Sequence, residues 1–212
     1  MVLLFQQGGW VMYPLLVFSI VSLSVILERM VFYFLTRQKL NVFLSELLSW
    51  QQNNKGKPLN NFPKELADKK KRGYLSGLLD IYLSCLDDEE KIFEEKIFIA
   101  GSTINKNNEK RLSILSTIAS LSPLIGLFGT VLGMIEVFQK LQSIGGKADV
   151  TLLSGGIWVA LLTTAFGLLI AIPSLLTHHY FSGVALERNE NLQFLVSQLN
   201  VMTGRSARFA AE

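Results

Sequence analysis

The chain has 212 residues, half of them hydrophobic, a formal net charge of +3 and a mean hydropathy of +0.36. This charge is too weak to indicate a nucleic-acid partner, and a single cysteine, Cys85, excludes a disulfide framework. Soluble domains also reach about 45–50% apolar residues, so the distribution decides the class. Three long stretches hold almost no charge while the segments between them are densely charged, which predicts an all-α membrane protein with three transmembrane helices.

Residues 1–35 are predicted to form a short N-terminal segment and the first transmembrane helix. No charged residue occurs from Trp10 to Leu27, and apolar residues resume after Glu28-Arg29. Trp10 and Tyr13 are expected to anchor the helix at the membrane interface. We reject a cleaved signal peptide, because no basic segment precedes the apolar run, the run is too long and no small-residue cleavage site follows.

Residues 36–112 are predicted to be a cytoplasmic helical region. Residues 36–111 hold 14 of the 20 Lys and Arg residues of the chain. Helical spacing of apolar residues marks segments at 40–50 and 74–86 and a longer one after an acidic cluster at 87–90, where negative charge suits a helix N-terminus. We expect this longer helix to run without a break into the second transmembrane helix.

The remaining sequence predicts two further transmembrane helices and a tail. The second helix covers 113–138, a short periplasmic loop covers 139–154, the third helix covers 155–176, and a cytoplasmic amphipathic helix and tail cover 177–212. Pro123 lies inside the second helix and is expected to kink it or to loosen one backbone hydrogen bond. Pro173 lies near the end of the third.

The basic residues predict the orientation. Residues 1–9 carry no Lys or Arg and the 139–154 loop carries two, whereas the large loop and the tail carry most of the rest. The positive-inside rule therefore places the N-terminus outside and the C-terminus in the cytoplasm.

Hydroxyl and glycine residues interrupt the second and third apolar stretches. Ser116 and Ser120 share a helix face, and Gly129 and Gly133 form a GxxxG motif. One interpretation is that each hydroxyl bonds the carbonyl one turn earlier and that the glycines pack helices together. The other is that the hydroxyls form a polar wall. Because no Asp, Glu, Lys, Arg or His lies at mid-depth, the chain either conducts nothing or relies on a partner's carboxylate.

Two long motifs resemble the ExbB/TolQ/MotA proton-channel family, nearer to ExbB and TolQ than to MotA. Residues 115–120 (LSTIAS) and 123–134 (PLIGLFGTVLGM) resemble the family's second-helix signature, and 155–173 (GGIWVALLTTAFGLLIAIP) its third-helix signature. Glu28-Arg29 at the end of the first helix also matches. The motifs lie in the order and topology that the family has.

The resemblance implies a ring, a homopentamer in the bacterial inner membrane around two copies of an ExbD/TolR-like single-span partner that carries the ion-binding Asp. It implies pore-lining roles in the ion pathway for Thr130, Thr164 and the neighbouring Thr163. Roles in helix packing and kinking are predicted for the prolines and glycines of the two spans, which are Pro123, Gly126, Gly129, Gly133, Gly167 and Pro173. No cofactor or metal site is implied, and membrane lipids are the remaining contact.

One position departs from the family's pattern. Many ExbB and TolQ chains have a glutamate just before the Ala-Leu of the third helix, and this chain has Val159 there. The chain also lacks the larger cytoplasmic domain and the four-span layout of MotA, which disfavours a flagellar stator.

The function predicted from these residues is that of a proton-channel, stator-like subunit that couples ion flow to mechanical work through its partner. The partner Asp would alternate between ionised and neutral forms, the charged form seeking hydroxyls or water. The alternative, which Val159 and the lack of a titratable group keep open, is a non-conducting membrane scaffold. An enzyme is disfavoured, because no nucleophile–base pair or metal cluster is present in the sequence.

Overall fold

A computed structural model describes residues 9–53, 73–143 and 150–204, and the elements in these ranges are all helices. They are α2 (Met12–Leu35), α3 (Leu40–Asn53), α5 (Tyr74–Ser84), α6 (Glu90–Glu109), α7 (Leu112–Ser143) and α8 (Val150–Thr203). Their contacts divide the chain into two compact units. Unit 1 comprises Met1–Arg29 and Arg111–Phe181, and unit 2 comprises Met30–Lys110 and Ser182–Glu212.

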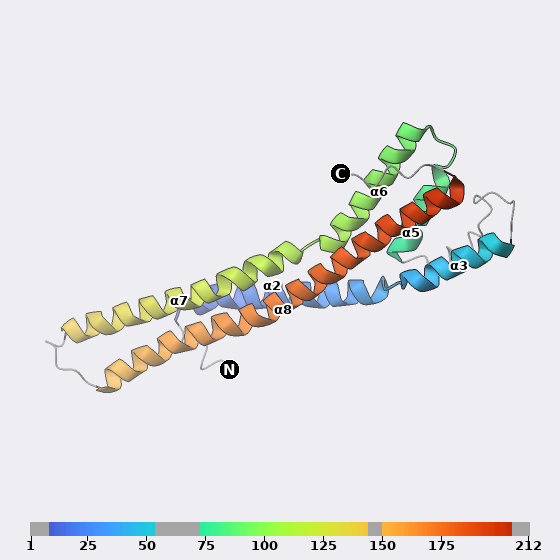
Figure 1. Ribbon diagram of the computed structural model, residues 1–212. Helices are drawn as coiled ribbons and strands as arrows, with labels where there is room; N and C mark the ends of the chain where they lie inside the picture. The colour runs from blue at the N-terminus through green and yellow to red at the C-terminus, as the bar shows by residue number, and fades with distance from the viewer. Residues whose placement is uncertain (1–8, 54–72, 144–149, 205–212) are drawn as a thin grey trace. The chain divides into compact units, whose positions relative to one another are not determined.

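Unit 1 is built from α2, α7 and the first part of α8, which lie side by side (Figure 1). Met12 and Leu15 of α2 pack with Ile118 of α7 and Ile170 of α8. Each of the three helices is long and apolar enough to cross a membrane, yet only 22–33% of its most apolar window is buried. The apolar side chains therefore face outward, as they do in helices surrounded by lipid or by other membrane helices.

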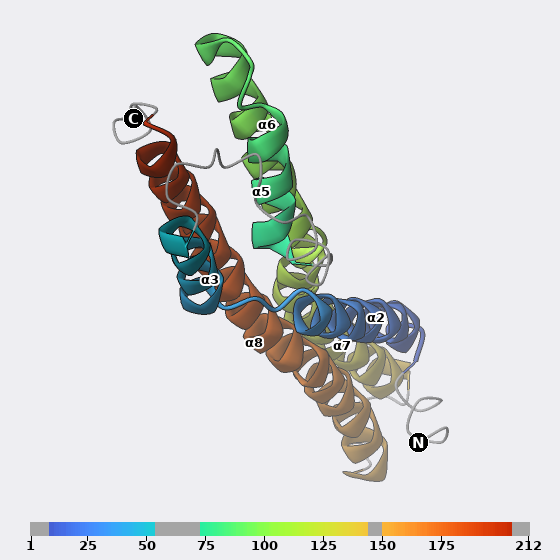
Figure 2. The ribbon, with the colours of Figure 1, turned by 90° about the vertical axis from the view of Figure 1, so that its right-hand side faces the viewer.

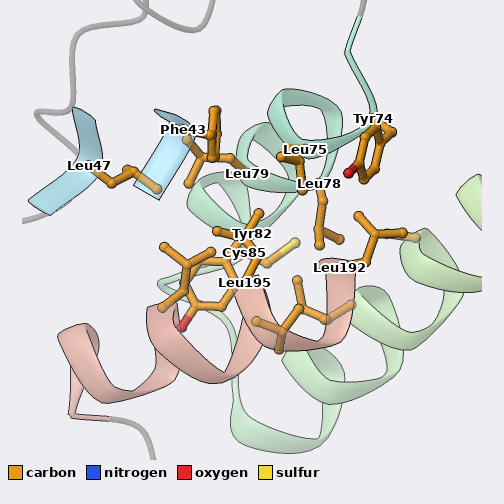
Figure 3. Close-up of a cluster of buried hydrophobic side chains, with 14 of the residues drawn as sticks. Phe43, Leu47, Tyr74, Leu75, Leu78, Leu79, Tyr82, Cys85, Leu192 and Leu195 are labelled. Atoms are coloured by element: carbon orange, nitrogen blue, oxygen red, sulfur yellow. The ribbon is translucent and has the colours of Figure 1, made fainter. Parts of the chain in front are cut away.

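Unit 2 has a conventional hydrophobic core. Helix α5 lies beside α6 in both views (Figures 1 and 2), and both contribute to the core together with α3 and the end of α8. Leu75, Leu79, Tyr82, Leu195 and Leu199 are completely buried there, as the close-up of this cluster illustrates for four of them (Figure 3). Unlike unit 1, unit 2 buries the apolar face of each helix, which is the pattern of a water-exposed helical domain.

Unit 2 also contains a buried arginine. Arg188 of α8 is 5% exposed and donates from Nη1 to Thr36 Oγ1 (2.9 Å) and Asn108 Oδ1 (3.3 Å), and from Nη2 to the Tyr33 carbonyl (3.3 Å). The rings of Tyr33 and Tyr74 lie 4.4 and 4.9 Å from its guanidinium carbon. Burial lowers the pKa of Arg188, but its guanidinium stays charged because an arginine pKa is so high. One side chain thus connects segments from four helices.

The expected uninterrupted helix from the acidic cluster into the second transmembrane helix is wrong. Helix α6 begins at Glu90, as the acidic cluster predicts, but ends at Glu109, and α7 begins at Leu112. Between them Lys110 has an extended ψ of 133° and Arg111 has a φ of +64°. The break falls at a lysine and an arginine and not at a Gly or Pro, although a non-glycine residue in the left-handed region is uncommon. Arg111 instead forms an ion pair with Glu28 of α2.

Two other boundaries also differ from the expectation. Helix α7 continues to Ser143 and α8 begins at Val150, so helix occupies both ends of the predicted 139–154 loop. The third transmembrane helix and the tail helix are one 54-residue element, α8, which passes through Pro173 without ending. The last eight residues of the predicted tail lie outside the described residues.

Replacing Arg188 by Ala is expected to lower the stability of unit 2 by about 2–4 kcal/mol, because two buried acceptors and one part-buried acceptor lose their donor at once. The stability of the Arg188→Lys variant should lie between those of the unchanged protein and of Arg188→Ala, since lysine keeps the charge but not the planar guanidinium. Thermal unfolding of the detergent-solubilised protein measures the effect. Glu190→Ala, at an exposed position of the same helix, is the control, and equal melting temperatures for the two alanine variants would contradict the prediction.

Candidate functional site

The candidate site is the seam between α7 and α8 in unit 1, made of small residues. The seam residues recur at intervals of four, three and four along each helix, which places them on one face. On α7 they are Ser122, Gly126, Gly129 and Gly133, and on α8 they are Gly156, Ala160, Thr163 and Gly167. All are buried except Gly156, which is half-buried.

The two backbones approach each other closely along this seam. A Cβ atom placed on Gly167 would lie 2.6 Å from the carbonyl oxygen of Ser122, and one on Gly126 would lie 3.0 Å from the carbonyl oxygen of Thr163. One on Gly133 would lie 3.3 Å from the Cβ of Ala160. The order of these contacts shows that the two helices are antiparallel, as Figure 1 also shows. Packing of this kind drives association of membrane helices, which gain little from the hydrophobic effect.

Two threonines of α8 meet the same carbonyl of α7. Thr164 Oγ1 donates to the Gly126 carbonyl at 3.2 Å. Thr163 Oγ1 donates to Ala160 in its own helix at 2.8 Å and lies 3.4 Å from the Gly126 carbonyl. Thr163 is 1% exposed and its hydroxyl fills the space that a side chain at Gly129 would need. Thr164 is only half-buried, so the two neighbours occupy different surroundings.

The third predicted pore residue, Thr130, lies one helical turn beyond the Gly126 carbonyl. Residues four apart share a helix face, so Thr130 lies on the same side of α7 as Gly126, whose carbonyl Thr164 binds. Thr130 is half-buried and donates its hydroxyl to Leu127 of its own helix at 2.6 Å. The structure therefore places the Thr130 hydroxyl at the Leu127 carbonyl and the Thr164 hydroxyl at the Gly126 carbonyl, while Thr163 packs inside the seam.

Other hydroxyls of α7 bond within their own helix. Thr117, Ser120 and Ser122 each donate to the carbonyl four residues earlier, at 2.7–3.0 Å. This is the packing interpretation of the hydroxyl row, and it describes these three residues. Thr164 differs because its hydroxyl reaches across to a neighbouring helix.

The two prolines lie beside hydroxyls that bond the backbone. Pro123 and Pro173 each remove one backbone donor, yet α7 and α8 continue through them. Ser122 donates to Ile118, and Ser174 donates to Ile170 at 2.7 Å. Neither hydroxyl bonds a carbonyl that a proline frees, because those are the carbonyls of Ala119 and Leu169, four residues before each proline.

Sequence reasoning missed a polar contact between α2 and α8. Ser22 and Ser174 are both buried, and their hydroxyl oxygens lie 2.6 Å apart. Since Ser174 donates its one hydrogen to Ile170, Ser22 is the donor to Ser174. Ser22 is one of three serines in the apolar run of the first helix, with Ser19 and Ser24, and nothing in the sequence singles it out.

Several charged and titratable groups of unit 1 lie near the starting end of α7. Glu28 pairs with Arg29 at 3.1 Å and also with Arg111. Arg29 is 2% exposed, an unusual position for an arginine. His178 of α8 holds the Leu112 carbonyl through Nδ1 at 3.0 Å. These contacts fix the first turn of α7, and only Glu28-Arg29 was singled out by sequence reasoning.

Comparisons with known proteins agree on one family. The profile of the MotA/TolQ/ExbB proton channel family matches residues 71–193. A protein of Synechocystis sp. named biopolymer transport protein ExbB-like 3, a name qualified there as provisional, is 27% identical over 203 residues, 94% of this chain and 93% of its own length. Biopolymer transport protein exbB1 of Vibrio cholerae is 29% identical over 169 residues, 80% of this chain and 73% of its own.

A second branch of the family matches more locally. The Tol-Pal system protein TolQ of Haemophilus influenzae is 42% identical over 74 residues, which are 35% of this chain and 32% of that protein. The profile match includes α6, α7 and most of α8, and thus the whole seam.

Replacing Gly167 by Ala is expected to destabilise the α7–α8 pair by about 1–3 kcal/mol, because the new methyl group would meet the Ser122 carbonyl and force the backbones apart. Gly155→Ala is the matched control on the same helix, where a Cβ atom meets nothing within 4 Å. It should be neutral or slightly stabilising, since alanine favours helix over glycine. Thermal unfolding in detergent compares the two variants, and a Gly167→Ala protein as stable as the control would contradict the assignment of the seam.

Proposed function

Since the chain belongs to the MotA/TolQ/ExbB proton channel family, we propose that it is the channel subunit of an ion-driven motor that energises transport or an envelope process. The observation that carries the proposal is the pair Thr130 and Thr164. Both are half-buried hydroxyls, Thr130 at the Leu127 carbonyl and Thr164 at the Gly126 carbonyl of the neighbouring helix, in spans that have no ionisable side chain at mid-depth. Such a polar strip is expensive in lipid, so it is more useful where it faces a partner or water.

The proposal assigns the titrating group to a partner. In this chain the spans 113–138 and 155–176 contain one ionisable side chain, Glu136, near the end of the first. Ion transfer at mid-depth therefore needs a carboxylate from another chain, and we propose an ExbD/TolR-like single-span protein that places its membrane Asp against Thr130 and Thr164. Thr163 is proposed as a packing residue of the seam, because it is buried between α7 and α8.

The proposed assembly is a ring of five copies around two partner helices in the inner membrane. The outward apolar faces of α2, α7 and α8 supply surface for neighbouring copies, partner helices and lipid. The N-terminus is proposed to be periplasmic and the C-terminus cytoplasmic, because the Lys and Arg residues concentrate in 36–111 and the tail. Unit 2, with its buried core, would then lie in the cytoplasm.

The energy source sets the scale of the work. A membrane potential supplies about 2.3 kcal/mol per elementary charge per 100 mV. Two carboxylates inside a five-fold ring cannot have identical surroundings at the same time. Stepwise loading and release of ions would then turn one component against the other, and we propose rotation on this mismatch of symmetry.

The proposed pore role predicts a selective defect for Thr164→Val. Valine keeps the shape but removes the oxygen, which should slow proton uptake about tenfold in liposomes that contain the chain and its one-span partner. Thr164→Ser should retain most of the uptake. Thr117→Val is the matched control, because Thr117 is an exposed hydroxyl of α7 that bonds only its own helix in the contacts described. Equal uptake by the valine variants at 164 and 117 would favour the scaffold.

The mass of the detergent-solubilised complex tests the architecture. Co-expression with the one-span partner should give the mass of five copies and two partners. Expression alone should leave a five-copy ring. A stable dimer, or a chain that retains no partner, would contradict the motor and leave the non-conducting scaffold.

A further inference from the structure

The hydroxyls of the proposed pore share a hydrogen-bond direction. We infer that Thr130 and Thr164 act as hydrogen-bond acceptors, and that they receive the partner's carboxyl group in its protonated, neutral form. This inference rests on the proposed function and specifies which state of the partner the wall binds. It reverses the expectation that the ionised carboxyl seeks the hydroxyls.

The direction follows from the hydroxyls' present partners. Thr130 lies 2.6 Å from the Leu127 carbonyl and Thr164 lies 3.2 Å from the Gly126 carbonyl. A carbonyl oxygen only accepts, so in each pair the threonine must supply the hydrogen. A hydroxyl has one hydrogen and two lone pairs, and its hydrogen is therefore already engaged. What remains for a ligand is lone pairs.

This selects between the two forms of a carboxyl group. An ionised carboxylate has only acceptor oxygens, so it gains nothing from a lone pair and is repelled by it. A neutral carboxylic acid carries one O–H, which can donate to Thr130 or Thr164 without disturbing the bonds they already make. The wall thus stabilises the protonated form, and the ionised form is better solvated by water or by free donors elsewhere.

The neighbouring residues resist a change of direction. Freeing the hydrogen of Thr164 would break a hydrogen bond between two membrane helices. The acceptor state is therefore the lower-energy state of the wall as the structure has it.

Charged side chains of unit 1 lie away from this wall along the helices. In the described residues they are Glu28 and Arg29 on α2, Arg111, Glu136 and Lys140 on α7, and the titratable His178 and His179 on α8. Glu136 is six residues from Thr130, or about 9 Å along the helix axis. His178 is 14 residues from Thr164, or about 21 Å. The two threonine hydroxyls are therefore the polar side chains that decide whether the pKa of the partner carboxyl rises or falls.

The experiment measures the sign of a pKa change in the assembled complex. Dicyclohexylcarbodiimide reacts with protonated carboxyl groups in membranes, so the pH dependence of partner labelling gives an apparent pKa. If the wall accepts from the protonated form, Thr164→Val removes that stabilisation and the midpoint should fall by about one pH unit. Thr130→Val should shift it in the same direction, which serves as the second variant should Thr164→Val fail to assemble.

The controls separate this inference from the function on which it rests. Thr164→Ser keeps an acceptor and should leave the midpoint in place, as should Thr117→Val. A midpoint that rises would show that the threonines donate to the ionised form, and an unchanged midpoint would show that they do not face the carboxyl; either overturns the inference while the motor stands. A complex that never retains a one-span partner overturns the proposed function as well.

Discussion

The close approach of α7 and α8 is the constraint on which unit 1 depends. Backbone atoms of the two helices come so near that a methyl group on Gly126 or Gly167 would collide with the opposite main chain. Membrane helices have little hydrophobic drive to associate, so van der Waals contact between backbones must supply it. The same closeness lets a side chain of α8 reach a carbonyl of α7. Packing and polarity in this site thus come from the same glycines.

Fixed polar contacts hold the ends of the helices in each unit. In unit 1 the Glu28–Arg111 pair and the bond from His178 to the Leu112 carbonyl hold the start of α7. In unit 2 Arg188 binds Thr36 and Asn108, which flank the ends of α2 and α6. A buried charge such as that of Arg188 is costly unless its hydrogen bonds are met, so it defines geometry more than it adds stability. Each unit has its own such anchor.

The sequence predicts the three spans, the α6 start and the packing role of the glycines because apolar length, charge clusters and residue size are local properties. It does not predict the break at 110–111, since Arg111 has no intrinsic preference for a positive φ and is held there by a distant glutamate. Nor does it separate Thr163 from Thr164. Adjacent residues of a helix point about 100° apart, and only the position of α7 decides which of them is buried. The Ser22–Ser174 contact is likewise a product of tertiary packing.

The valine at position 159 bears on the hydrogen-bond direction of the threonine hydroxyls, because it offers no acceptor of its own. At position 159 this chain has a half-buried valine, one residue before Ala160 of the seam. A second carboxylate there would itself accept hydrogen bonds and would compete with the threonines for any proton. With valine in that position, the oxygens of Thr130 and Thr164 are the acceptors that the proposed path retains at mid-depth. Ion loading in this chain then depends on a neutral partner carboxyl meeting lone pairs, and release depends on the carboxylate leaving them for water.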